Sequence, residues 1–312
     1  MKPMPWHAEL WERLQARLTR GALPHALLFC GPSGLGKRDF VQRFVRGLLC
    51  KERGPDGEAC GRCRSCLLLD AGTHPDFLTL GFGLRKDGVQ RSEIVVDQIR
   101  ELSARLAMSS QFGGWQIVVI DPADAMNMAA ANALLKTLEE PTPQTLLLLL
   151  ADAPWRLPQT IRSRCQRIDF QLPAPAEAIA WLHAAGIKNA EDALTAAGGN
   201  PGLAQVWAQD GALQRRQEVR KDLAALAAGR SETMEVVRRW LDSEPAQRLW
   251  FAAQAAAEEA RAKAVVTPGV LSSALDSEAL GRWYDSANRT RESLRGPLRG
   301  DLLLLELLAS WR

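Results

Sequence analysis

The sequence predicts an α/β domain built on a parallel sheet and followed by helical domains. Three observations predict this fold class. In the first part of the chain, short apolar runs alternate with segments of helical periodicity, which is the pattern of a parallel sheet covered on both faces. The first apolar run leads into a glycine-rich turn that opens a helix. After about residue 170, alanine and leucine dominate and strand patterns cease.

Each element follows from its local pattern. A strand buried in a parallel sheet has a short apolar run, whereas a helix that packs by one face repeats its apolar residues every three or four positions. By these rules the predicted strands are residues 26–30, 77–80, 116–121 and 145–150. The predicted helices of the α/β domain are residues 6–20, 39–49, 95–108 and 128–140. We therefore predict an α/β domain at 1–169 with a cysteine-rich module at 50–66, a small helical domain at 170–207 and a larger helical domain at 208–312.

Composition narrows the function classes. The chain has 312 residues, of which 46% are apolar, so it can bury a substantial core. Its net charge of +3 does not demand a nucleic-acid partner. The longest leucine stretch, residues 146–150, is far too short to span a bilayer, and the N-terminal residues lack the apolar stretch of a signal peptide. We therefore expect a cytoplasmic protein with no membrane contact.

The glycine-rich turn has the strand–loop–helix context of a phosphate-binding loop. Gly31 and Gly36 let the backbone approach phosphates, with Gly34 between them, and Lys37 would reach the terminal phosphates. The next position should be a serine or threonine whose hydroxyl binds Mg²⁺, but it is Arg38, a cation that cannot bind another cation. The sequence favours a phosphate-binding turn over a purely structural one, and it disfavours Mg–ATP chemistry.

A second loss lies at the end of the 116–121 strand. Asp121 stands where a carboxylate would hold Mg²⁺ in an ATPase. Its neighbour should be a glutamate that polarises water, but it is Pro122, which cannot act as a general base and is better explained as a turn former. Two losses in one site predict that hydrolysis has been abandoned, while ATP binding without turnover stays open.

Four cysteines in a short segment predict a metal site. Four thiolates suit tetrahedral Zn²⁺ and leave no open coordination position, so the site should be structural. Unligated surface cysteines and an iron–sulfur cluster are the alternatives. Nearby His74 is better explained as a structural histidine, and Cys30 as a small core residue. The predicted zinc ligands, in the spacing C-x9-C-x2-C-x2-C, are Cys50, Cys60, Cys63 and Cys66.

An arginine-containing segment follows the 145–150 strand and its loop. A Ser-Arg-Cys tripeptide, residues 163–165, is by itself a weak signal, because an arginine is usually part of a solvated face. Arginine can also stabilise charge on a transferring phosphoryl group, either within one chain or across an interface. Because the chain's own nucleotide site is degenerate, an arginine of this segment is more consistent with a role at the nucleotide site of a neighbouring chain.

Several stretches together resemble a known family. They are residues 23–29, the four-cysteine module, and residues 71–76, 131–141 and 162–165. Over essentially its whole length the chain resembles the delta-prime family of bacterial DNA polymerase III clamp-loader subunits. The resemblance implies an AAA+ core, a small helical lid and a C-terminal helical collar domain. It also implies that Arg164 is the arginine finger that reaches the ATP of an adjacent motor subunit.

The resemblance further implies the partners. They would be motor (gamma/tau) subunits and a delta subunit in a five-membered ring, with the sliding clamp and primer–template DNA reached through the complex, as part of a nucleoid-associated DNA-directed DNA polymerase holoenzyme. Two more departures separate the chain from the motors, which carry a sensor threonine where Ala151 stands and a sensor arginine where the chain reads Asn200-Pro201-Gly202. Lys37 is retained, although some family members lack it.

The leading hypothesis is therefore a non-motor subunit that helps load a clamp and lends Arg164 to a neighbour. One alternative is an active ATPase motor subunit of the same complex. Another is a stand-alone zinc-dependent nucleic-acid-binding protein, which is disfavoured because the cysteine module lacks interleaved aromatics and a strong basic cluster. In the C-terminal domain, the leucine-rich helix around residues 302–308 and the tryptophans at 240, 250, 283 and 311 are best explained as packing residues.

Overall fold

The computed structural model describes residues 3–84, 87–265, 271, 273–294 and 298–311. The chain divides into two units. The α/β unit comprises Met1–Trp181 together with Asn200–Leu203, and the helical unit comprises Leu182–Gly199 together with Ala204–Arg312. The three-domain division that we draw from the sequence stays a prediction.

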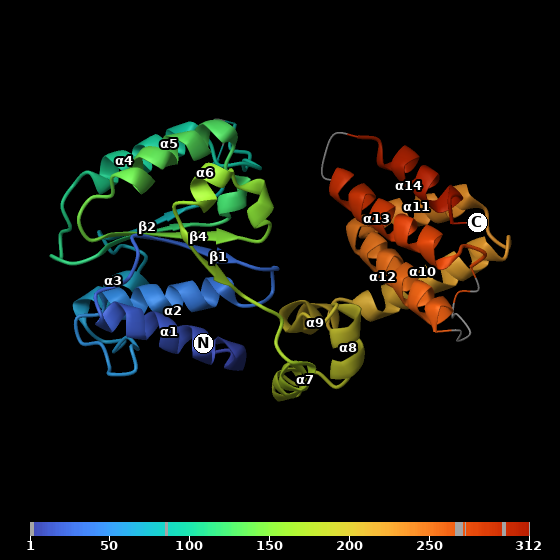
Figure 1. The fold of residues 1–312 in the computed structure, drawn as a ribbon, viewed down its shortest axis with the longest axis horizontal. Helices are drawn as coiled ribbons and strands as arrows, with labels where there is room; N and C mark the ends of the chain where they lie inside the picture. Colours follow the sequence, from blue (N-terminus) through green and yellow to red (C-terminus); the bar gives the residue numbers. More distant parts are fainter. Residues whose placement is uncertain (1–2, 85–86, 266–270, 272, 295–297, 312) are drawn as a thin grey trace. The chain divides into compact units, whose positions relative to one another are not determined.

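A five-stranded sheet forms the centre of the α/β unit (Figure 1). Its spatial order is β2-β3-β4-β1-β5 and every pair is parallel, as the sequence predicts. The parallel arrangement places the carboxyl ends of all strands at one edge, where ligand sites of such sheets lie. The strands are β1 (Ala26–Cys30), β2 (Phe77–Leu80), β3 (Gln116–Ile120), β4 (Thr145–Ala151) and β5 (Gln166–Asp169).

Helices cover both faces of this sheet. In Figure 1, α4 and α5 lie on one side and α1, α2 and α3 lie on the other. Two apolar clusters, one on each face, hold the layers together; Leu134 and Leu147 belong to the first, and Phe44 and Leu148 to the second. The helices are η1 (Pro5–His7), α1 (Ala8–Thr19), α2 (Lys37–Leu49), α3 (Arg64–Asp70), α4 (Val96–Leu106), η2 (Ala123–Ala125), α5 (Met128–Glu139), η3 (Pro154–Arg156) and α6 (Gln159–Arg162).

Several elements of the α/β unit are absent from our sequence prediction: β5, α3, and the short helices η2, η3 and α6. β5 is an edge strand whose residues are exposed except Ile168, so it has no apolar run to reveal it. α3 lies inside and just beyond the cysteine module, where glycines and a proline suggested only a loop. β4 also runs one residue further than predicted, through Ala151, which pairs with Cys30 of β1.

None of the described residues of the helical unit forms a strand. Trp240, Trp283 and Trp311 are buried, and each indole N–H donates within the unit, to Asp222, Leu307 and Leu223 respectively. These three tryptophans therefore pack in its core, as expected, while Trp250 is half-buried. Its helices are α8 (Ala190–Ala196), α10 (Ala212–Ala227), α11 (Thr233–Asp242), α12 (Pro245–Ala264), α13 (Ser277–Ser293) and α14 (Gly300–Ala309); α7 (Pro175–Ala184) and α9 (Pro201–Trp207) cross from one unit to the other.

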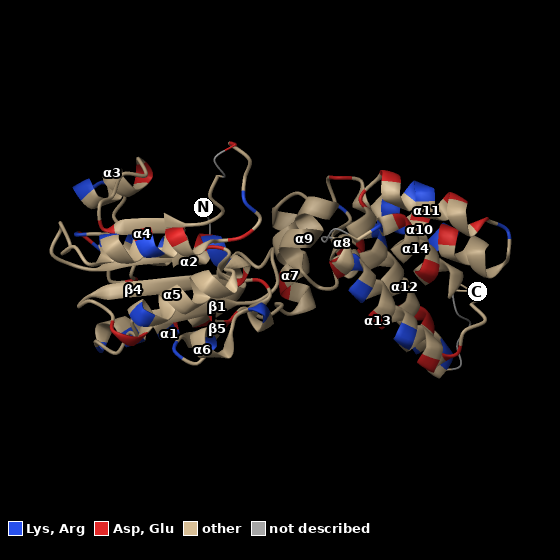
Figure 2. Cartoon of the chain, turned by 90° about the horizontal axis from the view of Figure 1, so that it is seen from above, with Lys and Arg blue, Asp and Glu red and all other residues tan. Residues whose placement is uncertain are grey.

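The helical unit exposes a mixed charged surface. Figure 2 shows basic and acidic residues interspersed along α10 and α11. Some of them pair across helices: Arg216 and Arg220 of α10 both bind Glu258 of α12. In α14, Leu304 and Leu308 are buried in the core while Leu302 is exposed. Among the described residues, no helix is both long enough and apolar enough to cross a membrane.

Candidate functional site

The loop that the sequence predicts to bind phosphates lies between β1 and α2, at the carboxyl edge of the sheet. Gly36 precedes α2 with φ of 75°, a left-handed conformation that favours glycine. Lys37 is the first residue of the helix, and its ammonium contacts the carbonyl oxygens of Gly31 at 2.6 Å and Pro32 at 2.8 Å. It also lies 2.6 Å from Oδ1 of Asp152, just after β4. An ammonium has three protons, so these three acceptors satisfy it completely.

The side chain of Arg38 lies against Asp121, the carboxylate that was expected to bind Mg²⁺. Nε of Arg38 lies 2.5 Å from Oδ2 of Asp121, and its Nη2 lies 3.0 Å from Oδ1. This two-pronged pair is the geometry in which arginine binds carboxylates most strongly. The hydrogen bond to Asp121 raises the pKa of Arg38 above its ordinary value. The carboxylate that would hold Mg²⁺ therefore holds a guanidinium of the same chain.

Pro122 occupies the turn that follows Asp121. It precedes the short helix η2, in agreement with its interpretation as a turn former. The next carboxylate in the chain, Asp124, accepts a hydrogen bond from the backbone N–H of Ala153 at 2.8 Å. Its other oxygen is buried without a hydrogen-bond partner in the described part of the chain. Asp124 thus links the ends of β3 and β4, a role that no pattern in the sequence indicates.

A later segment of the chain covers the loop. Nδ2 of Asn200 donates to the carbonyl oxygen of Ser33 at 2.7 Å, and its Oδ1 accepts from the N–H of Leu203 at 3.1 Å. A Cβ atom at Gly202 would stand 2.0 Å from the carbonyl oxygen of Gly34, so the two backbones meet where only glycine fits. From the sequence, this segment is distinguished only by its lack of a sensor arginine.

The space left in the loop is small. The cavity has a volume of about 260 Å³ and is lined among others by Met4, Lys37, Arg38, Asp121 and Asp152. Ligand pockets usually measure roughly 300–1,000 Å³. Of the predicted nucleotide-binding residues, Gly34, Gly36, Lys37 and Asp121 line this cavity, and Gly31 accepts a hydrogen bond from Lys37. The charged side chains of Lys37 and Asp121 are already paired, with Asp152 and Arg38 respectively.

The four cysteines converge at the far end of α2. Their sulfur atoms all lie within 4.8 Å of one another, and those of Cys50 and Cys63 are 3.9 Å apart. Four sulfurs at 2.3 Å from one tetrahedral Zn²⁺ would be separated by about 3.8 Å. The cluster can therefore hold a metal ion with little movement. The backbone N–H of Cys60 points at the sulfur of Cys50, and that of Cys63 at the sulfur of Cys60.

The electrostatics of these thiols differ. Burial opposes ionisation of Cys63, but the N–H groups of Cys66 and Lys51 point at its sulfur, and the balance lowers the pKa of Cys63 to about 6. Burial, with the neighbouring Cys63, raises the pKa of Cys66 to about 12. Burial also raises the pKa of Cys50. One thiolate is thus preformed at neutral pH, and at least two thiols must lose protons to a metal.

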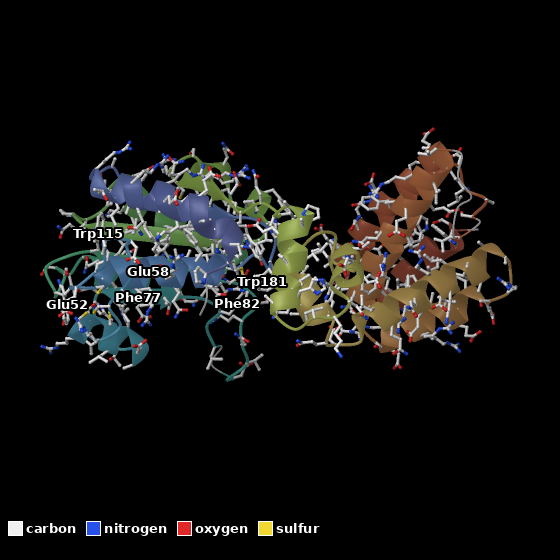
Figure 3. All side chains as sticks on the ribbon, turned by 90° about the horizontal axis from the view of Figure 1, so that it is seen from below. Glu52, Glu58, Phe77, Phe82, Trp115 and Trp181 are labelled. Atoms are coloured by element: carbon white, nitrogen blue, oxygen red, sulfur yellow. The ribbon has the colours of Figure 1, made fainter. Side chains whose placement is uncertain are left out.

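The module is fastened to the α/β unit by polar side chains. Figure 3 shows Glu52 and Glu58 on its loop; Glu52 pairs with Arg62, and Glu58 accepts from Nε of Arg43 in α2 at 2.6 Å. Nη1 of Arg46 in α2 lies 2.5 Å from Oδ1 of Asp70, the last residue of α3. These ion pairs therefore hold the cysteine module in place against α2.

His74 is a structural residue, as expected. Its Nε2 lies 2.9 Å from Oγ of Ser65, and that hydroxyl donates to the carbonyl oxygen of Leu49 at 2.7 Å. Its Nδ1 accepts from the N–H of Asp76 at 3.2 Å. These partners require the proton on Nε2, and burial lowers the pKa of His74, which keeps the ring neutral. Cys30 is buried in β1, also as expected.

Arg164 contacts residues other than those of the loop between β1 and α2. Its Nη2 is 2.6 Å from Oε1 of Glu139, and its Nη1 donates to the carbonyl oxygen of Thr160 at 3.1 Å. The side chain is 37% exposed. The next residue, Cys165, is buried, and burial raises its pKa to about 12, so it anchors the segment as an un-ionised thiol. Glu139 was missed, although it lies in the 131–141 stretch that carries the family resemblance.

Comparison with known proteins identifies the family. The family model described as "DNA polymerase III, delta subunit" matches residues 6–174. A DNA polymerase III subunit delta' from Pseudomonas aeruginosa is 38% identical over 79% of this chain and 74% of its own length. A DNA polymerase III subunit tau from Bacillus subtilis is 33% identical over 51% of this chain and 26% of its own.

Among solved structures, a DNA polymerase III gamma subunit-related protein from Thermotoga maritima is 16% identical, with a TM-score of 0.48 over 96% of this chain and 97% of that one. The family match covers more than half of the chain, and the Pseudomonas relative is covered over most of its length. The chain therefore belongs to the DNA polymerase III delta-prime subunit family.

Proposed function

We propose that this chain is a non-motor subunit of the DNA polymerase III clamp loader, which helps to place the sliding clamp on primed DNA. One observation carries the proposal: the nucleotide loop is occupied by its own side chains. Lys37 is satisfied by Asp152 and two carbonyl oxygens, and Arg38 occupies the carboxylate of Asp121. The carboxylate that would bind Mg²⁺ is therefore already paired with a cation, and the ammonium that would bind a phosphate has no free donor. We therefore expect the isolated chain to hydrolyse no ATP.

Arg164 is the group through which the chain would act on ATP. Its side chain is partly exposed on a segment anchored by buried Cys165, so it is available to an adjoining molecule. In the proposed complex it reaches the ATP of the neighbouring gamma/tau subunit as an arginine finger. That role leaves the chemistry to the neighbour and assigns this chain the stabilising charge.

The domain plan follows the same proposal. Residues 1–169 form the AAA+ core, residues 170–207 the lid, and residues 208–312 the collar domain that joins the subunits of a five-membered ring. Delta and gamma/tau subunits are the direct partners, and clamp and DNA are reached through the complex, in the cytoplasm at the replisome. The four cysteines, whose donor set and spacing suit Zn²⁺, hold a structural zinc.

Assembly tests this function directly. The purified chain, mixed with gamma/tau and delta subunits, should form one stable complex in size-exclusion chromatography with light scattering. The isolated chain should release no phosphate from Mg–ATP above a buffer blank. Rapid magnesium-dependent phosphate release by the isolated chain would instead identify an active motor subunit.

Repairing the two most visible losses should not create an ATPase. In the double variant Arg38→Thr, Pro122→Glu, the carboxylate of Asp121 is released for Mg²⁺ and a candidate general base is supplied. Lys37 remains bound to Asp152, however, and Ala151 offers no hydroxyl to the nucleotide. We expect phosphate release at the level of the unmodified chain, measured with Mg–ATP on the isolated protein. Turnover as fast as that of a gamma/tau subunit would show that the remaining departures do not matter.

A further inference from the structure

A carboxylate of the same chain holds the guanidinium of Arg164. Glu139 is the last residue of α5, and its Oε1 lies 2.6 Å from Nη2 of Arg164. On the other side, the carbonyl oxygen of Thr160 in α6 accepts from Nη1 at 3.1 Å. Because α5 and α6 are in contact, the guanidinium is bracketed between two helices of one unit.

The bracket leaves the guanidinium usable by a partner. A guanidinium has five N–H donors, and these two contacts engage only part of them. The side chains of Arg164 and Glu139 are 37% and 49% exposed, so the pair is open to solvent and can be shared with an incoming anion. Exposed ion pairs are weak, so a phosphate oxygen can compete for the same donors.

We propose that Glu139 is a positioning residue for Arg164. Its carboxylate restricts the guanidinium to one direction before any partner binds. Arginine loses much rotational freedom when it is ordered, and a side chain that is ordered in advance loses less at the moment of binding. Glu139 would therefore make Arg164 a better ligand for the phosphates of a neighbouring subunit's nucleotide. This inference rests on the proposed function of Arg164.

The chain offers a matched control in the next residue. Glu140 has the same side chain, is also exposed and lies at the end of the same helix. Within the described residues it forms no ion pair. Glu139→Gln removes the charge that binds Arg164, whereas Glu140→Gln removes an equal charge beside it. A difference between these variants therefore reports the contact and not the net charge.

The first measurement uses the isolated chain. Nitrogen-15 NMR of arginine side chains, with Arg164 assigned by its disappearance in Arg164→Ala, reports how freely the guanidinium rotates. We expect slow rotation in the unmodified chain and in Glu140→Gln, and fast rotation in Glu139→Gln. Equal rotation in all three would overturn the positioning role, whatever the complex does.

The second measurement uses the chain assembled with gamma/tau and delta subunits. Glu139→Gln should lower kcat for the Arg164-dependent part of ATP hydrolysis about two- to fivefold, the range that an exposed ion pair supplies. Glu140→Gln should leave it unchanged, and Glu139→Gln should have no further effect in an Arg164→Ala background.

The outcomes separate the two ideas. If Arg164→Ala lowers hydrolysis and Glu139→Gln does not, the positioning role is wrong and the trans role of Arg164 stands. An equal effect of Glu139→Gln with and without Arg164 would also overturn the positioning role. If Arg164→Ala itself changes nothing in the complex, the trans role is wrong and the functional part of this inference fails with it.

Discussion

In the proposed complex, Arg164→Ala is expected to abolish most ATP hydrolysis at the nucleotide site of the gamma/tau subunit that Arg164 would reach. An arginine finger is worth on the order of 10³–10⁵ in kcat where it has been removed from comparable sites. The total hydrolysis of a complex with several sites would fall less, by about the share of that single site. The loss should appear in kcat more than in KM, because the guanidinium stabilises charge that develops in the transition state. Steady-state phosphate release by the reconstituted complex measures both.

The variant should leave the chain folded. Arg164 is partly exposed, and its contacts are an exposed ion pair and one backbone carbonyl, so about 1 kcal/mol or less of unfolding free energy is at stake. Arg167→Ala is the matched control, since Arg167 is an exposed arginine nearby in β5 that pairs with Asp169. Arg164→Lys should rescue hydrolysis only in part, because lysine keeps the charge but loses the planar fork. A complex that hydrolyses ATP equally well with Arg164→Ala would remove the trans role.

Much of the α/β unit could be predicted because a doubly covered parallel sheet leaves a strong pattern. β1 and β4 are buried at every position, and their apolar runs marked them almost to the residue. β5 follows the opposite rule: an edge strand exposes polar side chains, so Gln166, Arg167 and Asp169 conceal it. The other edge strand, β2, has three apolar residues in Phe77–Leu80 and was predicted at its observed bounds, so an apolar run, and not the place in the sheet, decides whether local sequence reveals a strand.

The site shows a similar division. Sequence position alone indicated that Arg38 cannot serve Mg²⁺ and that four cysteines can gather. It did not indicate that Lys37 turns to Asp152, 115 positions away in the chain, or that Arg164 turns to Glu139. Such contacts are made by the folded sheet, whose register brings distant strand ends together. A motif specifies which side chains are present, and only the fold decides which acceptor each one finds.

Loss of the proposed zinc should have the second large effect, this time on structure. We expect one zinc per chain by metal analysis, and none in Cys66→Ser, because Cys66 is a fully buried member of the four-sulfur cluster. Zinc contributes roughly 10–16 kcal/mol to the folding of comparable small modules. The 50–66 segment has few apolar contacts of its own to replace that contribution. Protease cleavage within it should therefore become fast in the variant and in chelator-treated protein.

The sheet should survive this loss, since two apolar clusters that do not depend on the metal hold it together. Circular dichroism should accordingly change little while the module becomes cleavable. Cys30→Ala is the control, because Cys30 lies in β1 outside the cluster and its loss should leave zinc content unchanged. A purified chain without metal and with a protease-resistant module would contradict the zinc site. A visible charge-transfer absorption would instead indicate an iron–sulfur cluster.

The thiol pKa values give the pH dependence of this site. At neutral pH without metal, Cys66 with its pKa near 12 and Cys50 with its raised pKa carry protons, so zinc binding must release them. Lower pH therefore weakens zinc binding, because protons compete for the same sulfurs. Below about pH 6 the thiolate of Cys63 takes up a proton as well, and the affinity should fall more steeply there. Competition with a chelator between pH 8 and pH 5.5 measures this slope; an affinity that does not change with pH would show that the thiols are not the ligands.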